Sequence, residues 1–337
     1  MTAIRLGLIG AGAVGVLHAD AATGIPGVRV TAVCDIVADT ARRVAAPLNA
    51  AVFTDHRALI ASGLVDAVVV NTPHALHTDI VTAAAAAGLH VLVEKPMATR
   101  SEDCTLMERA CADAGVVLFV GHIQHFLPPV AAAKAALDAG AVGAVLAVHD
   151  WRSTDYRPGS RPAWFFDPAV SGGGVFINIG THCVDRLLWL TGRRATAVSA
   201  TAVHRGDLLV ETDVLARLEL DDGIAGHITV TSTRLPARDE LTVIGERGTI
   251  RVARGTGAVL HPDDGDPVVL ADESDDDVPT AFLDQLTAFA AAVCGEQPPV
   301  IPAAHGRRVI EAVESVYAAC ATGERVAVPD RAEASVA

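Results

Sequence analysis

A group of glycines near the start of the chain has the spacing that dinucleotide binding requires. Gly10, Gly12 and Gly15 follow the apolar run Ile4 to Ile9 and open an Ala-rich segment that continues from Val14. In such a strand–turn–helix unit, glycines allow the tight turn, the approach of the backbone to a pyrophosphate, and close packing of the helix on the strand. The expected phosphate-binding residues are Gly10, Ala11, Gly12, Ala13, Val14 and Gly15.

Asp35 adds a second feature of the same motif. It stands 20 residues after Gly15, at the end of the apolar run Val28 to Cys34. A carboxylate in this position can accept a hydrogen bond from a ribose 2′-hydroxyl and repels a 2′-phosphate. The sequence therefore predicts NAD as the cofactor in preference to NADP, and it disfavours the alternative of a purely structural glycine turn.

Two further segments end apolar runs in the same region of the chain. In an open α/β sheet the carboxyl ends of the strands form the ligand crevice, so residues that follow those strands are candidates for cofactor contact. The candidates here are Asn71, Thr72, Pro73, Glu94 and Lys95.

Lys95 stands out by its residue type. The chain has 26 basic residues, of which only Lys95 and Lys134 are lysines. Pro96 restricts the backbone of Lys95 and keeps it out of a helix. An isolated lysine before proline is usually an exposed loop residue. The position at a strand end, and the rarity of lysine in this chain, favour a chemical role for Lys95.

A glycine-rich segment in the middle of the chain carries a histidine and an amide. Gly172, Gly173 and Gly174 precede Asn178 and His182, which are four residues apart and would share one face of a helix. Near a helix N-terminus the macrodipole favours neutral imidazole, the form that can accept a proton. The alternative is a core histidine whose nitrogens are satisfied by hydrogen bonds.

Two pairs of histidines at a spacing of three residues raise the question of a metal. They are His74 with His77, and His122 with His125. A zinc site needs further ligands, and no cysteine or carboxylate joins either pair at a recognised spacing. The sequence therefore predicts no metal site.

The segments that must position these residues alternate between strand and helix patterns over the first third of the chain. This alternation predicts βαβ units, and thus a parallel Rossmann sheet with helices on both faces. Strands are expected at 4–9, 28–34, 51–53, 67–71, 90–94 and 116–120, and helices from residue 14 and at 38–48, 57–62, 78–87 and 101–114.

After Gly121 the pattern changes to several strands with few helices between them. Asp221-Asp222-Gly223 is a hairpin signal, so the second sheet should be antiparallel or mixed. The stretch from Asp263 to Asp277 is predicted to be an acidic loop. The domains are expected at 1–121 and 122–337. Strands are expected at 142–151, 197–203, 212–220, 224–233, 241–244 and 249–253, and helices at 129–139, up to 190, 281–293 and 304–321.

Composition excludes several classes of protein. The 337 residues are 51% hydrophobic, which excludes wholesale disorder, and the net charge of −14 argues against nucleic acid or an anionic membrane as partner. No apolar run is long enough to span a bilayer, and no signal peptide is apparent at the N-terminus. Six cysteines without a C-x-x-C pair indicate reduced thiols and a cytoplasmic location.

Taken together, these motifs resemble the Gfo/Idh/MocA oxidoreductases. The resemblance rests on the glycine turn, on Asn71-Thr72-Pro73 with His77 downstream, on Glu94-Lys95-Pro96, and on the three glycines followed by Asn178 and His182. It implies an N-terminal Rossmann domain and a C-terminal α/β domain with an open, largely antiparallel sheet for substrate binding and oligomerisation, in a homodimer or homotetramer. It also implies that His77 belongs to the cofactor site, that Lys95 is the catalytic lysine and that His182 is the catalytic histidine.

The chain departs from the family pattern at two positions. Many members have Asp where this chain has Asn178, so a Lys–Asp–His proton relay is incomplete here. The segment from Gly121 to Pro128 resembles a stretch that usually ends Arg-Phe-x-Pro, and His125 replaces that Arg, which leaves the charge preference for substrate open. His122, in the same segment, is a weaker candidate for substrate contact. Trp164 and Phe165 are either a core plug or, as the family implies, neighbours of nicotinamide and substrate.

The expected function is an NAD-dependent oxidoreductase that transfers hydride to or from a secondary alcohol or ketone of a sugar, cyclitol or sugar nucleotide. General acid–base help with the hydroxyl proton is worth about 10²–10⁴-fold in rate. We assign it to His182, with Lys95 orienting the oxygen and Asn178 holding His182 or a substrate hydroxyl; the reverse assignment of Lys95 and His182 stays open. The alternatives are an NAD-dependent glycosidase of the same superfamily and a non-catalytic dinucleotide sensor.

Overall fold

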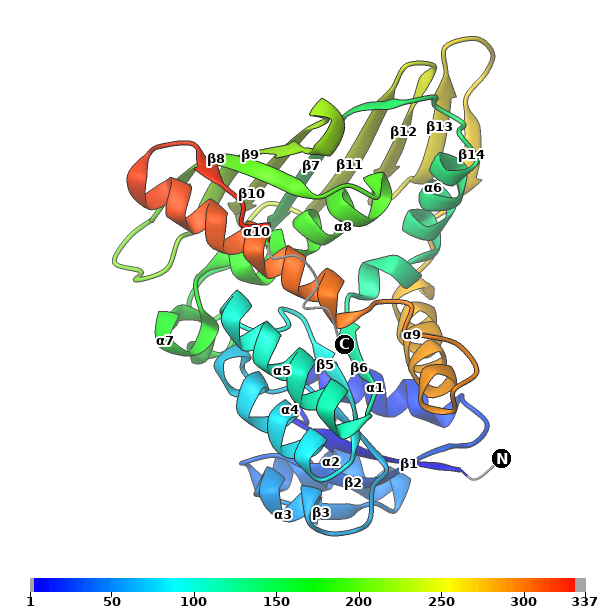
Figure 1. Ribbon diagram of the computed structural model, residues 1–337, viewed down its shortest axis with the longest axis vertical. Helices are drawn as coiled ribbons and strands as arrows, with labels where there is room; N and C mark the ends of the chain where they lie inside the picture. Colours follow the sequence, from blue (N-terminus) through cyan, green and yellow to red (C-terminus); the bar gives the residue numbers. More distant parts are fainter. Residues whose placement is uncertain (1–2, 331–337) are drawn as a thin grey trace. The chain divides into compact units, whose positions relative to one another are not determined.

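The computed structural model of the chain describes residues 3–330, which form two compact units (Figure 1). Of the described residues, the N-terminal unit contains 3–126 together with 278–307, and the C-terminal unit contains 127–277 and 308–330. The late segment 278–307 thus packs with the N-terminal unit. That residues 1–121 bind NAD and residues 122–337 bind substrate and form the oligomer stays a prediction.

The N-terminal unit is built on a six-stranded parallel sheet in the order β3-β2-β1-β4-β5-β6. This is the strand order of the dinucleotide-binding Rossmann fold, as predicted. Its strands are β1 (Ile4–Ile9), β2 (Val28–Cys34), β3 (Ala51–Phe53), β4 (Ala67–Val70), β5 (His90–Glu94) and β6 (Leu118–Gly121). Its helical elements are α1 (Ala13–Thr23), α2 (Ala38–Leu48), α3 (His56–Ile60), η1 (His74–Leu76), α4 (His77–Ala86), α5 (Ser101–Ala114), η2 (Ile123–Phe126) and α9 (Asp277–Val293).

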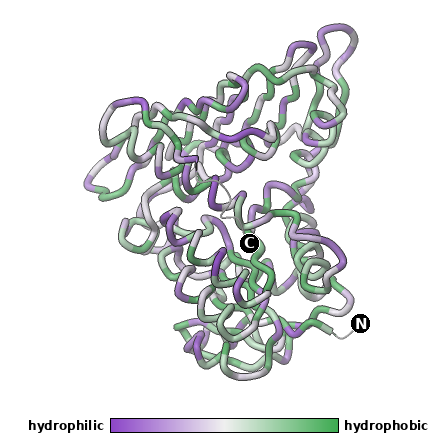
Figure 2. Tube along the Cα trace, viewed as in Figure 1, coloured by the Kyte–Doolittle hydropathy of each residue, from purple (hydrophilic) through white to green (hydrophobic). Residues whose placement is uncertain are grey.

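Apolar strands explain why this sheet is covered on both faces. All four residues of β4 are buried, and β1 is buried at every position except Arg5. Strands of a parallel sheet with helices on both faces read as continuous hydrophobic runs for this reason. Along β1, next to the N label of Figure 2, the trace is mostly drawn in the hydrophobic colour.

The C-terminal unit contains a nine-stranded sheet in the order β14-β13-β12-β11-β7-β10-β9-β8-β15. Every neighbouring pair is antiparallel except β10 with β7. Its strands are β7 (Val145–Thr154), β8 (Ala195–Val203), β9 (Asp213–Leu220), β10 (Ala225–Ser232), β11 (Arg238–Gly245), β12 (Gly248–Ala253), β13 (Gly257–Pro262), β14 (Val268–Ala271) and β15 (Val326–Ala327). Its helical elements are α6 (Pro128–Asp138), η3 (Ala163–Phe166), α7 (Pro168–Ser171), η4 (Phe176–Gly180), α8 (Thr181–Thr191), η5 (Asp221–Gly223) and most of α10 (Ala303–Thr322).

One face of this second sheet packs on helices and the other is more exposed. In β9, Val214, Ala216 and Leu218 are buried while Leu215 and Arg217 between them are exposed, the alternation expected of a half-buried strand. The buried residues form one core with α8 and α10. Asp221-Asp222-Gly223 does connect the antiparallel strands β9 and β10, as the hairpin signal predicts.

One expectation about the C-terminal part needs correction. The stretch from Asp263 to Asp277 is not a continuous loop, because β14 (Val268–Ala271) lies inside it and pairs with β13. The strand sequence Val-Val-Leu-Ala is short and flanked by acidic residues, so the acidic residues hide the strand pattern in the sequence.

In the part of the chain that the structure describes, no helix is both long and apolar enough to cross a bilayer.

Candidate active site

The glycine turn between β1 and α1 has the geometry that its sequence predicts. Gly10 has a φ of +95°, and a Cβ on it would lie 2.6 Å from the carbonyl oxygen of Asn71. A Cβ on Gly15 would lie 2.3 Å from the carbonyl oxygen of Gly10, so the helix can pack on the turn only through glycine. These two positions require glycine because of the protein's own backbone.

Gly12 requires a different explanation. A Cβ there would have no protein atom within 4 Å, so the fold itself does not exclude a side chain. Gly12 is the N-cap of α1, and no side chain caps the N–H groups of that first turn. Uncapped N–H groups at a helix N-terminus bind phosphate, and a bare glycine lets the backbone approach it. These residues fit the pyrophosphate of a dinucleotide.

Asp35 lies beside this turn and holds it. Its Oδ2 accepts a hydrogen bond from the N–H of Ala11 at 3.0 Å, and its Oδ1 accepts one from the N–H of Val37 at 2.9 Å. A carboxylate has about four lone-pair sites, so it can still accept from a ribose hydroxyl. The side chain of Ile36, which follows, is 90% exposed. Through these two hydrogen bonds Asp35 fixes the shape of the glycine turn, and it also places a negative charge beside it.

His77 is buried, and both of its ring nitrogens lie close to backbone carbonyl oxygens, so contact with the cofactor stays a prediction. It is fully buried at the start of α4; its Nε2 lies 2.9 Å from the carbonyl oxygen of Thr72, and its Nδ1 lies 3.0 Å from that of Pro96. Burial lowers the pKa of this imidazole, although the carbonyl contacts act against it. The ring therefore joins the segments that follow β4 and β5, and it is a positioning residue for both.

A buried histidine also supports the segment that carries Lys95. His18, on α1, places its Nε2 2.9 Å from Oε1 of Glu94, and neither residue is appreciably exposed. The other carboxylate oxygen of Glu94 accepts the N–H of Lys95 at 3.1 Å. A Cβ on Gly121 would lie 3.0 Å from Oε1, so the neighbouring strand leaves the carboxylate little room to move. Glu94 is thus a support for Lys95, and the half-buried lysine projects from the carboxyl end of β5.

The three glycines of the C-terminal unit are held by Glu211, a residue without any motif in the sequence. Its carboxylate accepts the N–H groups of Gly174 and Phe176 at 2.8 and 2.9 Å, and the hydroxyl of Tyr317 at 2.8 Å. Burial raises the pKa of Glu211, and the hydrogen bonds from Phe176 and Tyr317 oppose that rise. A Cβ on Gly173 would lie 2.2 Å from the Tyr317 hydroxyl oxygen, so glycine is needed at this position.

Asn178 and His182 follow this turn in a helical segment that begins directly after Gly174, as expected, but whose first turn is a π-helix. Phe176–Gly180 winds as a π-helix that runs directly into α8, so His182 lies about two turns inside a continuous helical segment. The macrodipole acts only within the first turn of a helix. The predicted dipole effect on His182 is therefore wrong. Both side chains are buried, Asn178 at 5% and His182 at 8% exposure.

Trp164 and Phe165 form a small aromatic stack on η3. Their ring centroids are 3.8 Å apart, and the carbonyl oxygen of Phe165 accepts the hydroxyl of Tyr156 at 3.0 Å. Both rings are half-buried, and Phe165 packs against the edge of the C-terminal core. The packing of Phe165 fits the expected role of a core plug, and the partial exposure of both rings leaves room for the other expected role, contact with nicotinamide and substrate. That contact stays a prediction.

Two family models match the chain in sequence order. The oxidoreductase family model with an NAD-binding Rossmann fold matches residues 4–122, and the Gfo/Idh/MocA C-terminal domain model matches residues 130–251. The chain belongs to the Gfo/Idh/MocA oxidoreductase family. This confirms the predicted family and fold. The match to an NAD-binding model also confirms the predicted cofactor.

Curated proteins and solved structures are similar to this chain over most of its length. A levoglucosan dehydrogenase of Pseudarthrobacter phenanthrenivorans is 32% identical over 74% of this chain and 73% of its own length. A scyllo-inositol 2-dehydrogenase (NAD(+)) of Bacillus subtilis is 29% identical over 73% of each protein. The crystal structure of GenD2 from gentamicin A biosynthesis in complex with NAD has a TM-score of 0.88 and 25% identity, over 98% of this chain and 97% of that one.

Within this family member, Asp35→Ala should change cofactor preference. Removal of the carboxylate abolishes repulsion of a 2′-phosphate, and it also takes the acceptor from the N–H of Ala11. We expect the ratio of the NADP to the NAD dissociation constant to fall about tenfold, which corresponds to roughly 1.4 kcal/mol, while NAD itself binds more weakly. Isothermal titration of both dinucleotides measures the ratio. Asp35→Asn is the matched control because it removes the charge but keeps an oxygen acceptor; tighter NADP than NAD binding by the native protein would contradict the assignment.

A buried ion network fixes α8, the helix that carries His182, to the second sheet. Arg186, 1% exposed, donates to Asp150 from Nε at 3.0 Å and from Nη2 at 2.7 Å, and its Nη1 lies 2.9 Å from Asp239. Arg152 pairs with Asp239 at 2.6 Å. Burial by itself raises the pKa of Asp239, but the charges of Arg152 and Arg186 outweigh it and lower the pKa to about 2.

Asp239→Asn should destabilise the protein at neutral pH and much less in acid. The folded-state pKa lies below the unfolded value of about 3.9, so the carboxylate contributes fully above roughly pH 4 and loses its contribution as the pH falls towards 2. Breaking a buried pair costs about 3–5 kcal/mol. Urea unfolding at pH 7 and below pH 3 measures the difference. Asp222→Asn, from an exposed pair with Arg193, is the control and should cost about 0–1 kcal/mol at either pH; an equal cost of Asp239→Asn at both pH values would refute the pairing.

Proposed function

We propose that this protein is an NAD-dependent dehydrogenase or ketoreductase acting at a secondary alcohol or ketone of a sugar, cyclitol or sugar nucleotide. The observation that carries the proposal is the position of Lys95 relative to the glycine turn. β1, β4 and β5 are adjacent and parallel, so Gly10, Asn71 and Lys95 follow three strand ends along one edge of the sheet. The substrates in the names of the levoglucosan and scyllo-inositol dehydrogenases, a sugar anhydride and a cyclitol, support this class of substrate.

In this proposal NAD, when bound, supplies the nicotinamide carbon that accepts or returns the hydride. The Lys95 ammonium orients the substrate oxygen and stabilises negative charge that develops on it. His182 accepts the hydroxyl proton during oxidation and returns it during reduction. Asn178 cannot exchange a proton, so its amide is left to hold a substrate hydroxyl or the imidazole of His182.

The test is turnover across a panel of sugars, cyclitols and sugar nucleotides with NAD, followed by NADH absorbance. A dehydrogenase accumulates NADH and a ketone in equal amounts. Cleavage of a glycoside without net NADH would favour the glycosidase alternative. Tight NAD binding without turnover on any member of the panel would favour the sensor.

We also propose that the protein is a cytoplasmic homodimer or homotetramer that associates through the outer face of the second sheet. Trp151 and Leu215, which flank Thr229 of β10 in the sheet register, are 46% and 51% exposed. His149 and His227 pair two residues further along β7 and β10, with ring centroids 4.8 Å apart. Apolar side chains gathered on one exposed face indicate an association surface. Sedimentation of the native protein and of Leu215→Glu tests this, since a monomeric native protein contradicts it.

A further inference from the structure

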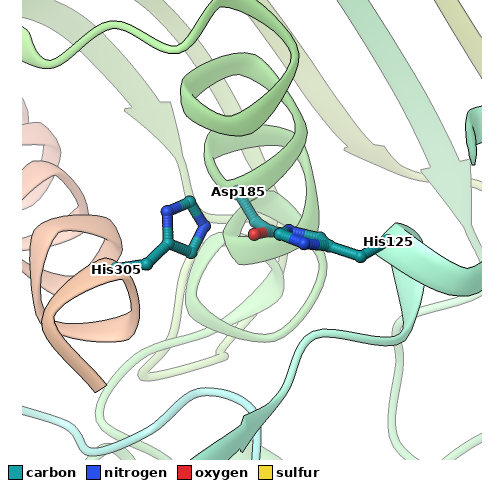
Figure 3. A group of neighbouring side chains, drawn as sticks. All are labelled: His125, Asp185 and His305. Carbon is teal, nitrogen blue, oxygen red and sulfur yellow. The ribbon is translucent and has the colours of Figure 1, made fainter. Parts of the chain in front are cut away.

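Three histidines of the N-terminal unit gather at the end of β6. His122 directly follows that strand, His125 lies in η2, and His305 lies in the first turn of α10. The ring centroids of His122 and His125 are 6.3 Å apart, those of His122 and His305 5.7 Å, and those of His125 and His305 5.3 Å. The first two side chains are buried and the third is half-buried. Figure 3 shows His125 and His305, and it also labels Asp185, which belongs to the C-terminal unit.

The fold explains why these rings meet. Residues three apart lie above one another in a 3₁₀ turn, so η2 directs His122 and His125 to the same side. His305 comes from 180 residues further along the chain, because Pro302 forms a β-bridge with Phe119 of β6. A Cβ on Gly306 would lie 2.9 Å from Cγ2 of Val120, which shows how closely the start of α10 packs on the strand. The packing of α10 on β6 therefore fixes the position of His305 beside the other two histidines.

The arrangement suits a metal ion that prefers nitrogen. Ligand nitrogens of His125 and His305 lie within 4.8 Å of each other. Zinc binds imidazole at about 2.0–2.1 Å, which places two nitrogens on one tetrahedral ion roughly 3.4 Å apart. The His125 and His305 side chains must therefore rotate to bind one ion, and so must the His122 ring, whose centroid lies 6.3 and 5.7 Å from theirs. Imidazole donors favour Zn²⁺, Ni²⁺, Co²⁺ and Cu²⁺, whereas Mg²⁺ and Ca²⁺ prefer oxygen.

We propose that His122, His125 and His305 bind one divalent transition-metal ion of the zinc class. Gly121 is in register with Glu94 in the parallel pair β5–β6. His122 and Lys95 therefore leave the sheet at neighbouring strand ends, and the metal site lies on the same edge of the sheet as the proposed catalytic lysine. The sequence by itself points away from a metal because the third ligand is distant in the chain.

The experiment titrates the chelator-treated full-length protein with Co²⁺ alone and then displaces it with Zn²⁺. We expect one equivalent of Co²⁺ with visible absorption bands that Zn²⁺ removes. His125→Gln and His305→Gln should each weaken Co²⁺ binding by more than about tenfold, since even outer-shell changes at metal sites cost 10–100-fold. His204→Gln, from an exposed loop of the other unit, is the matched control and should bind like the native protein.

Two results would overturn the metal site. One is the absence of a saturable equivalent in the native protein, and the other is equal affinity in the His125, His305 and His204 variants. NAD binding shows that each variant is folded. If the Gln variants lose NAD binding as well, His305→Cys decides, because a thiolate ligand must add a sulfur-to-cobalt charge-transfer band and its absence refutes the site. Turnover is not measured, so this outcome is independent of the proposed function.

Discussion

Lys95→Met should lower kcat by about 10²–10⁴-fold, while NAD still binds. This is the range that a positioned proton-transfer or charge-stabilising group contributes. Methionine keeps most of the length of the side chain but has neither charge nor protons to donate. The expected dinucleotide contacts of the glycine turn and Asp35 do not involve this side chain, and the hydrogen bond of Glu94 to the backbone N–H of Lys95 is kept in the variant. The measurement is steady-state turnover on the best substrate of the panel together with calorimetric titration of NAD.

The chain offers a matched control for this variant. Lys134 is its other lysine, and it pairs with Asp138 on α6 in the C-terminal unit. Lys134→Met removes the same chemical group from a surface helix, and we expect turnover close to that of the native protein. A Lys95→Met protein that keeps most of its turnover would exclude Lys95 as a catalytic residue, whatever the family resemblance implies.

His182→Ala should lower kcat/KM by about 10²–10⁴-fold as well, and it should remove the acidic limb of the pH profile of alcohol oxidation. That limb reports protonation of the base in the free enzyme. The helix dipole does not set its position, because the π-helical turn Phe176–Gly180 places His182 well inside the helix. The neighbouring side chain one turn earlier, Asn178, then becomes the main variable that a substitution can change.

Asn178→Asp tests this relation between the two side chains. A carboxylate one helical turn from His182 favours imidazolium and should move the acidic limb upward by about one pH unit or more. An amide provides no such charge, so the native enzyme should remain active to lower pH than the variant. Profiles of kcat/KM for the native protein and both variants on one substrate decide the matter. An unshifted limb in a folded, NAD-binding Asn178→Asp protein would remove the support for His182 as the base.

Glu211 shows why part of the candidate site is invisible in the sequence. It has no motif around it, and it meets Gly174, 37 residues earlier, and Tyr317, 106 residues later. The neighbouring glycines Gly172 to Gly174 do not identify it either, because a run of glycines does not indicate which distant side chain contacts the backbone there. His77 is a similar case, because the sequence does not show that its ring lies among three backbone carbonyl groups from two separate segments.

The sequence by itself determined the features that depend on neighbours along the chain. α2, β3, β5 and α5 have the predicted bounds, and Gly10, Gly12, Gly15 and Asp35 form the predicted turn, because apolar periodicity and glycine spacing are local properties. Only the tertiary structure decided the strand order, the π-helical turn before His182, and the meeting of His305 with His122 and His125. Those features depend on packing between segments that are far apart in the chain. A motif defined by the spacing of neighbouring residues cannot include His305, which lies 180 positions after His125.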